Sequence, residues 1–73
     1  MDRLEIMGER IKQLRKERRL RQREMAEMLD VVLQHYQKIE YGKVNISVMT
    51  ACILADYFGV TVDYLLGRSD NRG

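Results

Sequence analysis

The sequence predicts an all-α domain, a compact bundle of five short helices, on three observations. Apolar residues recur at steps of three and four along most of the chain, which is the period of one helix face. Glycine and short polar side chains stand where these periodic stretches end and begin. No stretch alternates as a strand would, and a chain of 73 residues has room for one domain only.

The first expected helix carries an apolar face formed by Leu4, Met7, Ile11 and Leu14. Its start has two interpretations. Asp2 and Glu5 have the spacing of a capping box, which would begin the helix at the N-terminus. Gly8 weakens a helix at this point and equally favours a start near Met7. In both cases we expect the helix to end by Arg19.

Residues 22–42 predict two short helices joined by a tight turn at 30–32. In the first of them, Ala26 has almost no side chain and lets two helices cross closely. The second helix, 33–41, turns Tyr36, Ile39 and Glu40 inward. Its opposite face then carries Leu33, Gln34, Gln37 and Lys38.

A fourth helix follows the loop after Gly42, which ends the preceding helix. Ser47 is a good N-cap, and Gly59 marks the end, so this helix is expected over 47–58. Its apolar positions predict an inward face made of Val48, Ala51, Leu54, Ala55 and Phe58.

The last short helix is expected over 62–66, with Thr61 as its N-cap and apolar residues that close the core. The polar residues that follow lack apolar positions with which to pack. We therefore expect a domain over 1–68 and a short flexible tail over 69–73.

The net charge of +2 is small, but its distribution is uneven. Within fourteen positions stand eight of the thirteen basic residues, namely Arg10, Lys12, Arg15, Lys16, Arg18, Arg19, Arg21 and Arg23. Such a concentration creates a local field for a polyanion such as nucleic acid. The alternative is an ordinary solvated helix surface, since Glu9, Glu17 and Glu24 neutralise part of the charge.

A single cysteine, Cys52, excludes an intrachain disulfide and a multi-cysteine zinc site. No apolar run approaches the length of a membrane span and no signal-peptide core is present, so we expect a cytoplasmic protein without membrane contact. No nucleophile–base pair or glycine-rich phosphate loop indicates an enzyme. We therefore expect no cofactor, no metal and no small-molecule ligand.

Three segments carry a family resemblance: GERIKQLRKERRL from Gly8, IEYGK from Ile39 and GVTVDYLLG from Gly59. They resemble the Cro/CI-type (XRE-like) helix-turn-helix transcriptional regulators, without a gap over most of the chain. The resemblance implies a lambda-repressor-like bundle in which the second and third helices form the helix-turn-helix. Arg21 and Val32 stand where relatives usually carry a Ser or Thr cap, and Asp30 replaces the usual glycine of the turn.

The outer face of the third helix carries side chains that can contact the edges of DNA bases. A glutamine amide can pair with adenine, a lysine can reach guanine acceptors, and a leucine can contact a thymine methyl in the major groove. We expect base contacts from Leu33, Gln34, Gln37 and Lys38. The alternative is that these residues are an ordinary exposed helix surface.

The resemblance adds phosphate contacts beside this helix. Gln22 matches a glutamine that bonds a phosphate and braces the recognition helix, while Lys43 and Asn45 match a second phosphate clamp. A phosphate would also suit Arg21 at its helix N-terminus. The expected phosphate contacts are Arg21, Gln22, Arg23, His35, Lys43 and Asn45. Loop and cap residues without such a role would look the same in sequence.

Two further groups are expected to have structural roles. The resemblance implies an ion pair between Arg15 and Glu40, which would be part of the scaffold. On the fourth helix, an extra apolar stripe at helical spacing, joined by a nearby tyrosine, predicts a dimer interface made of Met49, Ile53, Tyr57 and Tyr64. The alternative is that Leu4 and Ile6 of the N-terminal segment bury the stripe.

The leading functional hypothesis is a homodimeric, sequence-specific regulator that binds double-stranded DNA and represses by blocking a promoter. A second hypothesis keeps the fold and makes the chain a protein-interaction module, such as an antitoxin or an antirepressor-like adaptor. Binding to duplex DNA separates the two.

Overall fold

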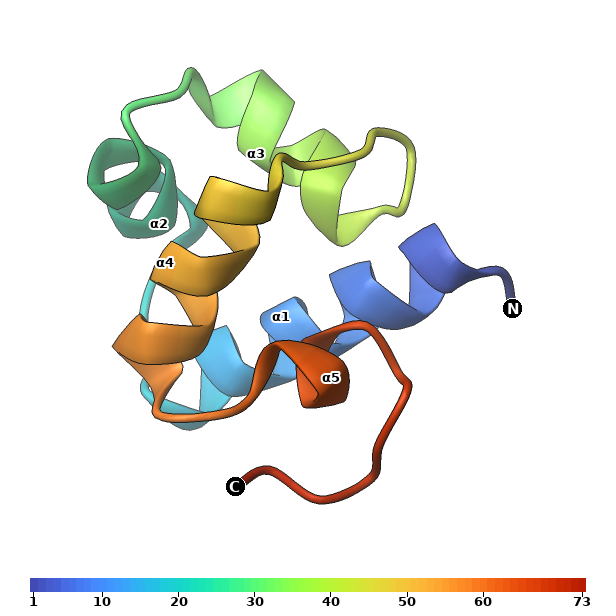
Figure 1. The fold of residues 1–73 in the computed structure, drawn as a ribbon. Helices are drawn as coiled ribbons and strands as arrows, with labels where there is room; N and C mark the ends of the chain where they lie inside the picture. The colour runs from blue at the N-terminus through green and yellow to red at the C-terminus, as the bar shows by residue number, and fades with distance from the viewer.

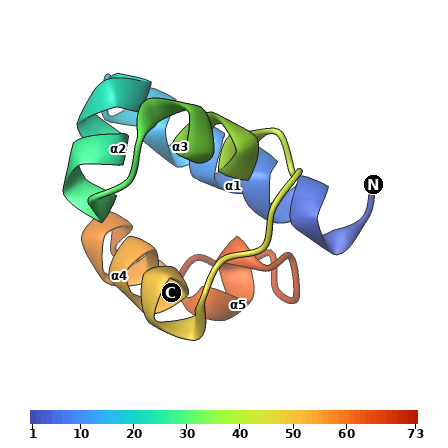
Figure 2. The same ribbon diagram turned by 90° about the horizontal axis from the view of Figure 1, so that it is seen from above.

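Five helices follow one another in the computed structural model, which describes residues 1–73 (Figure 1). Their bounds are α1 Arg3–Glu17, α2 Gln22–Leu29, α3 Leu33–Glu40, α4 Val48–Phe58 and α5 Val62–Leu65. Viewed from above, α1, α2 and α3 lie on one side of the molecule and α4 and α5 on the other (Figure 2). The long helix α1 packs against both α3 and α5. The predicted all-α class with five helices is confirmed.

The helix α1 begins at the earlier of the two expected starts. Asp2 accepts the backbone N–H of Glu5 at 2.8 Å, and Glu5 in return accepts the backbone N–H of Asp2 at 3.0 Å. This capping box satisfies two of the free N–H groups at the helix end. Gly8 lies inside the helix without breaking it. A Cβ at Gly8 would lie 2.5 Å from the carbonyl oxygens of Ile39 and Glu40, so the glycine permits the close approach of α1 to α3.

The helices of the helix-turn-helix begin without side-chain caps, as their sequence departures predict. Arg21 and Val32 are extended N-cap residues whose side chains accept no hydrogen bond from the helix. At α2 only the reciprocal half of a capping box forms, because Glu24 accepts the backbone N–H of Arg21 at 2.9 Å. Asp30 takes the left-handed conformation, with φ of 57°, that the turn between α2 and α3 needs.

The caps of α4 and α5 agree with their prediction. Ser47 accepts the N–H of Thr50 at 3.1 Å, and Thr61 accepts the N–H of Tyr64 at 3.0 Å. The predicted inward orientation of Val48 is wrong, since its side chain is 79% exposed. Val48 is the first residue of α4, where the face that meets the core begins only with the next turn, at Ala51.

One core joins all five helices. Side chains from each of them are buried in a single cluster made of Met7, Ile11, Leu14, Met25, Ala26, Tyr36, Ile39, Leu54, Ala55, Phe58, Tyr64 and Leu65. Burial of one large aliphatic or aromatic side chain stabilises a fold by roughly 1.5–3 kcal/mol. The helix α3 contributes Tyr36 and Ile39, which are 0% and 1% exposed, so its inner side is fixed in the core.

Residues 69–73, expected as a flexible tail, make contacts in the structure. Arg72 bonds both carboxylate oxygens of Glu17, at 2.8 and 2.7 Å, and its carbonyl accepts the N–H of Thr61. Arg10 donates to the carbonyl of Ser69 at 2.6 Å and to Asp70 at 2.8 Å. The tail therefore lies across α1 and the start of α5.

Candidate nucleic-acid interface

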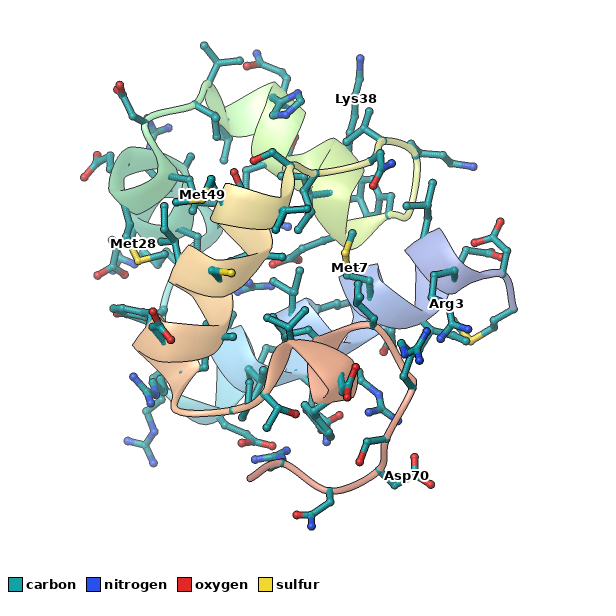
Figure 3. All side chains as sticks on the ribbon, in the orientation of Figure 1. Arg3, Met7, Met28, Lys38, Met49 and Asp70 are labelled. Atoms are coloured by element: carbon teal, nitrogen blue, oxygen red, sulfur yellow. The ribbon has the colours of Figure 1, made fainter.

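The outer face of α3 carries the four residues predicted to contact bases. Gln34 and Lys38 are exposed, and Lys38 points away from the body of the molecule (Figure 3). Leu33 and Gln37 are half-buried at the edge of the same face. On the inner side, Tyr36 and Ile39 anchor the helix in the core. The structure thus brings the four residues together on one surface, at two different depths.

The position of α3 is fixed by a buried carboxylate at its C-terminal end. Glu40 is 4% exposed and faces Arg15 of α1, with 2.6 Å from Nε to Oε2 and 3.2 Å from Nη2 to Oε1. The hydroxyl of Tyr36 donates to the same carboxylate, and Gln22 donates to it from Nε2 at 3.1 Å. One carboxylate therefore links α1, α2 and α3. The predicted Arg15–Glu40 pair forms.

The surroundings of Glu40 keep it ionised. Burial alone would raise the pKa of its carboxyl, but hydrogen bonds from Arg15, Tyr36 and Gln22 outweigh burial and hold that pKa below its ordinary value. The hydrogen bond to Glu40 raises the pKa of Arg15. Burial, reinforced by the bond to Glu40, raises the pKa of Tyr36. At neutral pH the cluster is a carboxylate with a guanidinium and a neutral phenol.

A second hydrogen bond extends this cluster to the outer face of α3. Gln37 donates from Nε2 to Oε1 of Gln22 at 3.1 Å, and Gln22 in turn donates to Glu40. Both polar atoms of the Gln22 side chain are thus engaged within the protein, which leaves one amide proton for the predicted phosphate contact. Gln22 was expected to brace the recognition helix, and it contacts α3 through hydrogen bonds with Gln37 and Glu40.

The other residues predicted to contact phosphate are exposed; one is on α3 itself, and the others precede or follow that helix along the chain. They are Arg21, Arg23, His35, Lys43 and Asn45. The N-terminus of α2 is next to the C-terminal half of α3, because Gln22 bonds to residues of that half. Lys43 follows α3 directly along the chain, so basic side chains flank the helix end on both sides. Asn45 uses its Oδ1 to accept the N–H of Ile46 at 2.9 Å.

Part of the basic cluster seen in sequence belongs to the scaffold. Arg10 donates to the carbonyl of Tyr64 at 2.7 Å, and Arg18 donates to the carbonyl of Tyr57 at 2.9 Å. Arg15 is committed to Glu40. These three arginines bond to groups within the protein, so they form neither the expected field for a polyanion nor an ordinary solvated helix surface. The basic residues next to α3 are a separate group.

Three of the four predicted dimer residues form an exposed stripe on α4. Met49, Ile53 and Tyr57 are 69%, 48% and 40% exposed, and neither Leu4 nor Ile6 buries them. The assignment of Tyr64 to this surface is wrong, because it is only 7% exposed. Its ring lies between two guanidinium groups, with Arg10 at 4.3 Å and Arg72 at 5.3 Å from the ring centroid.

Sequence reasoning missed two contacts of this site. Tyr36 was assigned to the apolar core, yet its hydroxyl bonds to Glu40; the signal was available, since residues four apart share one face of a helix. The bond from Gln37 to Gln22 had no such signal, because it joins two helices and depends on how their amides are oriented.

Comparison with known proteins places this site in a family. The helix-turn-helix family matches residues 11–65, which include all of α2, α3, α4 and α5. The chain belongs to the helix-turn-helix family. The resemblance to Cro/CI-type regulators is thereby confirmed at the level of the family. In this helix-turn-helix protein, α3 occupies the position of the second helix of the motif.

One curated relative and one solved structure add detail. The helix-turn-helix chain is 36% identical over 61 residues to the SPbeta prophage-derived uncharacterized HTH-type transcriptional regulator YonR of Bacillus subtilis strain 168. That match covers 84% of this chain and 56% of YonR, so the chain spans little more than half of the relative's length. The fold is similar to the crystal structure of the restriction-modification controller protein C.AhdI from Aeromonas hydrophila, with a TM-score of 0.73 at 24% identity. This similarity covers 85% of this chain and 94% of C.AhdI, and it concerns the fold alone.

No helix is long and apolar enough to cross a lipid bilayer. No group of three or more His, Cys, Asp or Glu side chains is arranged to hold a metal ion.

Proposed function

We propose that this protein is a sequence-specific DNA-binding transcriptional regulator that reads the major groove with α3. The observation that carries the proposal is the two-sided character of this helix. Its inner side is fixed by the core and by Glu40, and its outer side presents Gln34 and Lys38 to solvent. A rigid helix with a polar outer face of this kind suits the width of the major groove.

The proposed contacts divide by role. Gln34 and Lys38 meet base edges, Leu33 meets a thymine methyl, and Gln37 meets a base at the edge of the same face. Phosphate contacts fix the register of the helix in the groove without reading sequence. We assign them to Arg21, Gln22, Arg23, His35, Lys43 and Asn45.

We further propose that the regulator acts as a homodimer through the exposed stripe on α4. A two-fold dimer presents two recognition helices to successive major grooves, about 34 Å apart on a near-palindromic site. The stripe supports this assignment because Met49, Ile53 and Tyr57 expose apolar area on one helix face. Occupation of a promoter by the dimer would repress transcription. We assign this activity to the cytoplasm.

A gel-shift titration at low salt tests the DNA-binding function. The wild type is expected to bind duplex DNA with micromolar affinity or better, and Gln34→Ala combined with Lys38→Ala is expected to weaken binding while leaving the fold unchanged by circular dichroism. Both side chains are exposed, so their truncation removes no core contact. Gln13→Ala, on an exposed position of α1, is the matched control and should bind as the wild type does.

The exposed stripe on α4 also supports a second candidate function, a protein-interaction module with the same fold. The two functions separate in the same titration. A folded wild type that binds no duplex at low salt would reject the DNA-binding function and support the module.

A further inference from the structure

The side chains of Gln37, Gln22 and Glu40 form a hydrogen-bonded series. Its donors and acceptors can be assigned in only one way. An ionised carboxylate accepts hydrogen bonds and cannot donate them, so Glu40 takes the N–H of Gln22 and not its carbonyl. The separation of Gln22 Nε2 from Glu40 Oε1 is 3.1 Å. With its nitrogen toward Glu40, Gln22 offers its carbonyl oxygen, Oε1, to α3.

The orientation of the Gln22 amide in turn fixes that of the Gln37 amide. Nε2 of Gln37 lies 3.1 Å from Oε1 of Gln22, and the reverse orientation would bring two carbonyl oxygens together. A free glutamine can turn its amide by half a rotation, because the nitrogen and oxygen ends have nearly the same shape. Here Glu40 fixes the orientation of both amides. It stays a carboxylate because hydrogen bonds from Arg15, Tyr36 and Gln22 and the charge of Arg15 outweigh burial and lower the pKa of its carboxyl.

The other polar atom of Gln37, Oε1, reaches the surface. No hydrogen bond within the protein uses this oxygen, and no buried side-chain nitrogen or oxygen lacks a partner, so Oε1 is open to solvent. Gln37 lies one turn along α3 from Leu33, on the same face. The outer face of α3 therefore presents a carbonyl oxygen whose place is set from within the protein, together with the second N–H of the same amide, which no bond within the protein uses.

A fixed carbonyl oxygen needs a donor opposite to it. In the major groove, donors come from the amino groups of adenine and cytosine, whereas guanine and thymine present only acceptors. We propose that Gln22 is a positioning residue: by orienting the amide of Gln37 it makes α3 select a base with an exocyclic amino group, adenine or cytosine, at the position that Gln37 faces. The inference rests on the proposed DNA-binding function and assigns part of its specificity.

Selection of bound duplexes from a random pool tests the inference with four variants. Methionine keeps the length of glutamine and removes its polar atoms, so Gln37→Met deletes the oxygen and Gln22→Met leaves the Gln37 amide free to rotate. Wild type is expected to enrich adenine or cytosine at one position of each half-site, and Gln37→Met to lose that enrichment. Gln22→Met should admit guanine or thymine there, with the preference reduced roughly two- to tenfold, the range for one neutral hydrogen bond.

Two variants are matched controls. Gln34 lies outside the hydrogen-bonded series, so Gln34→Met should change the base preference at a different position of the site. Gln13→Met, exposed on α1, should leave the whole profile unchanged. Enrichment of guanine or thymine by the wild type at the position that depends on Gln37 would overturn the inference. So would a Gln22→Met profile equal to that of the wild type.

A measurement without DNA separates this inference from the function on which it rests. In NMR spectra the side-chain amide signals of Gln37 are expected to move on Gln22→Met, because their hydrogen-bond acceptor is lost. If they do not move, the series does not exist in solution and the inference fails while duplex binding stands. If they move and the folded wild type binds no duplex, the proposed function fails, and the series is scaffold only.

Discussion

Arg15 of α1 and Glu40 of α3 form a two-pronged ion pair, with 2.6 Å between Nε and Oε2 and 3.2 Å between Nη2 and Oε1. Because Gln22 of α2 also bonds to Glu40, this carboxylate connects α1, α2 and α3. The proposed reading surface is on the outside of α3. Its placement therefore depends on a carboxylate that is itself buried.

Removal of one partner of this pair should destabilise the fold strongly. Arg15→Met leaves Glu40 as a buried charge without its cation, which typically costs about 3–5 kcal/mol. Urea unfolding followed by circular dichroism measures the loss. Arg68→Met, which breaks the exposed pair with Asp63, is the control and should change the free energy of unfolding far less. Equal stability of Arg15→Met and wild type would contradict the role assigned to the pair.

The same carboxylate should make stability depend on pH. The pKa of Glu40 in the folded protein is below its ordinary value of 4.5, so the unfolded chain takes up a proton first as the pH falls. The stabilisation is therefore present above pH 4.5 and is lost as the pH falls through the folded pKa. Urea unfolding between neutral and acid pH should show a steeper loss for the wild type than for Glu40→Gln. Parallel curves would show that another group carries the acid sensitivity.

Helix positions and most of the core followed from the sequence, because periodic apolar residues and capping residues report local structure directly. The prediction for Tyr64 is wrong because its ring is covered by the guanidinium groups of Arg10, which is distant along the chain, and of Arg72, and both reach it only in the folded protein. Val48 shares the periodicity of the core face, but it belongs to the first turn of α4, which projects beyond the core. Such burial is a property of packing between elements, which local periodicity does not contain.

The residues of the site were also predictable where local periodicity determines them, and not where they depend on contacts between helices. Helical periodicity assigned Leu33, Gln34, Gln37 and Lys38 to the outer face of α3, and the structure places them together on it. The bond from Gln37 to Gln22 depends on the orientation of two amides on different helices, and sequence carries no direct signal for it.

Gly8→Ala should destabilise the protein by forcing α1 away from α3. The added Cβ would lie 2.5 Å from the carbonyl oxygens of Ile39 and Glu40, which are backbone atoms and cannot rotate aside. Overpacking of this kind typically costs about 1–3 kcal/mol, even though alanine favours a helix more than glycine does. Thermal unfolding measures the change. A higher melting temperature would mean that helix propensity outweighs the contact.

Arg21→Ser should increase stability and weaken the salt dependence of DNA binding. Serine accepts a hydrogen bond at the start of α2, where Arg21 accepts none, and such a cap contributes about 1 kcal/mol. Loss of one phosphate contact should reduce the slope of log affinity against log salt by about 1. Thermal unfolding and binding titrations at several salt concentrations measure the two effects. An unchanged slope would remove Arg21 from the phosphate contacts.

Ile53→Glu should shift the protein toward monomer. Ile53 is at the middle of the exposed stripe on α4, and a dimer would bury the new carboxylate against apolar side chains. Sedimentation equilibrium measures the change, with Gln13→Glu as a control that adds the same charge to an exposed position of α1. A wild type that is monomeric at all concentrations would exclude this interface.

The most direct measurement of the central claim is NMR chemical-shift mapping of the wild type during titration with its selected duplex. We predict that the largest changes occur in α3, from Leu33 to Lys38, together with Arg21 and Lys43 beside it. Changes confined to the exposed face of α4, with α3 unaffected, would contradict the claim that α3 reads DNA.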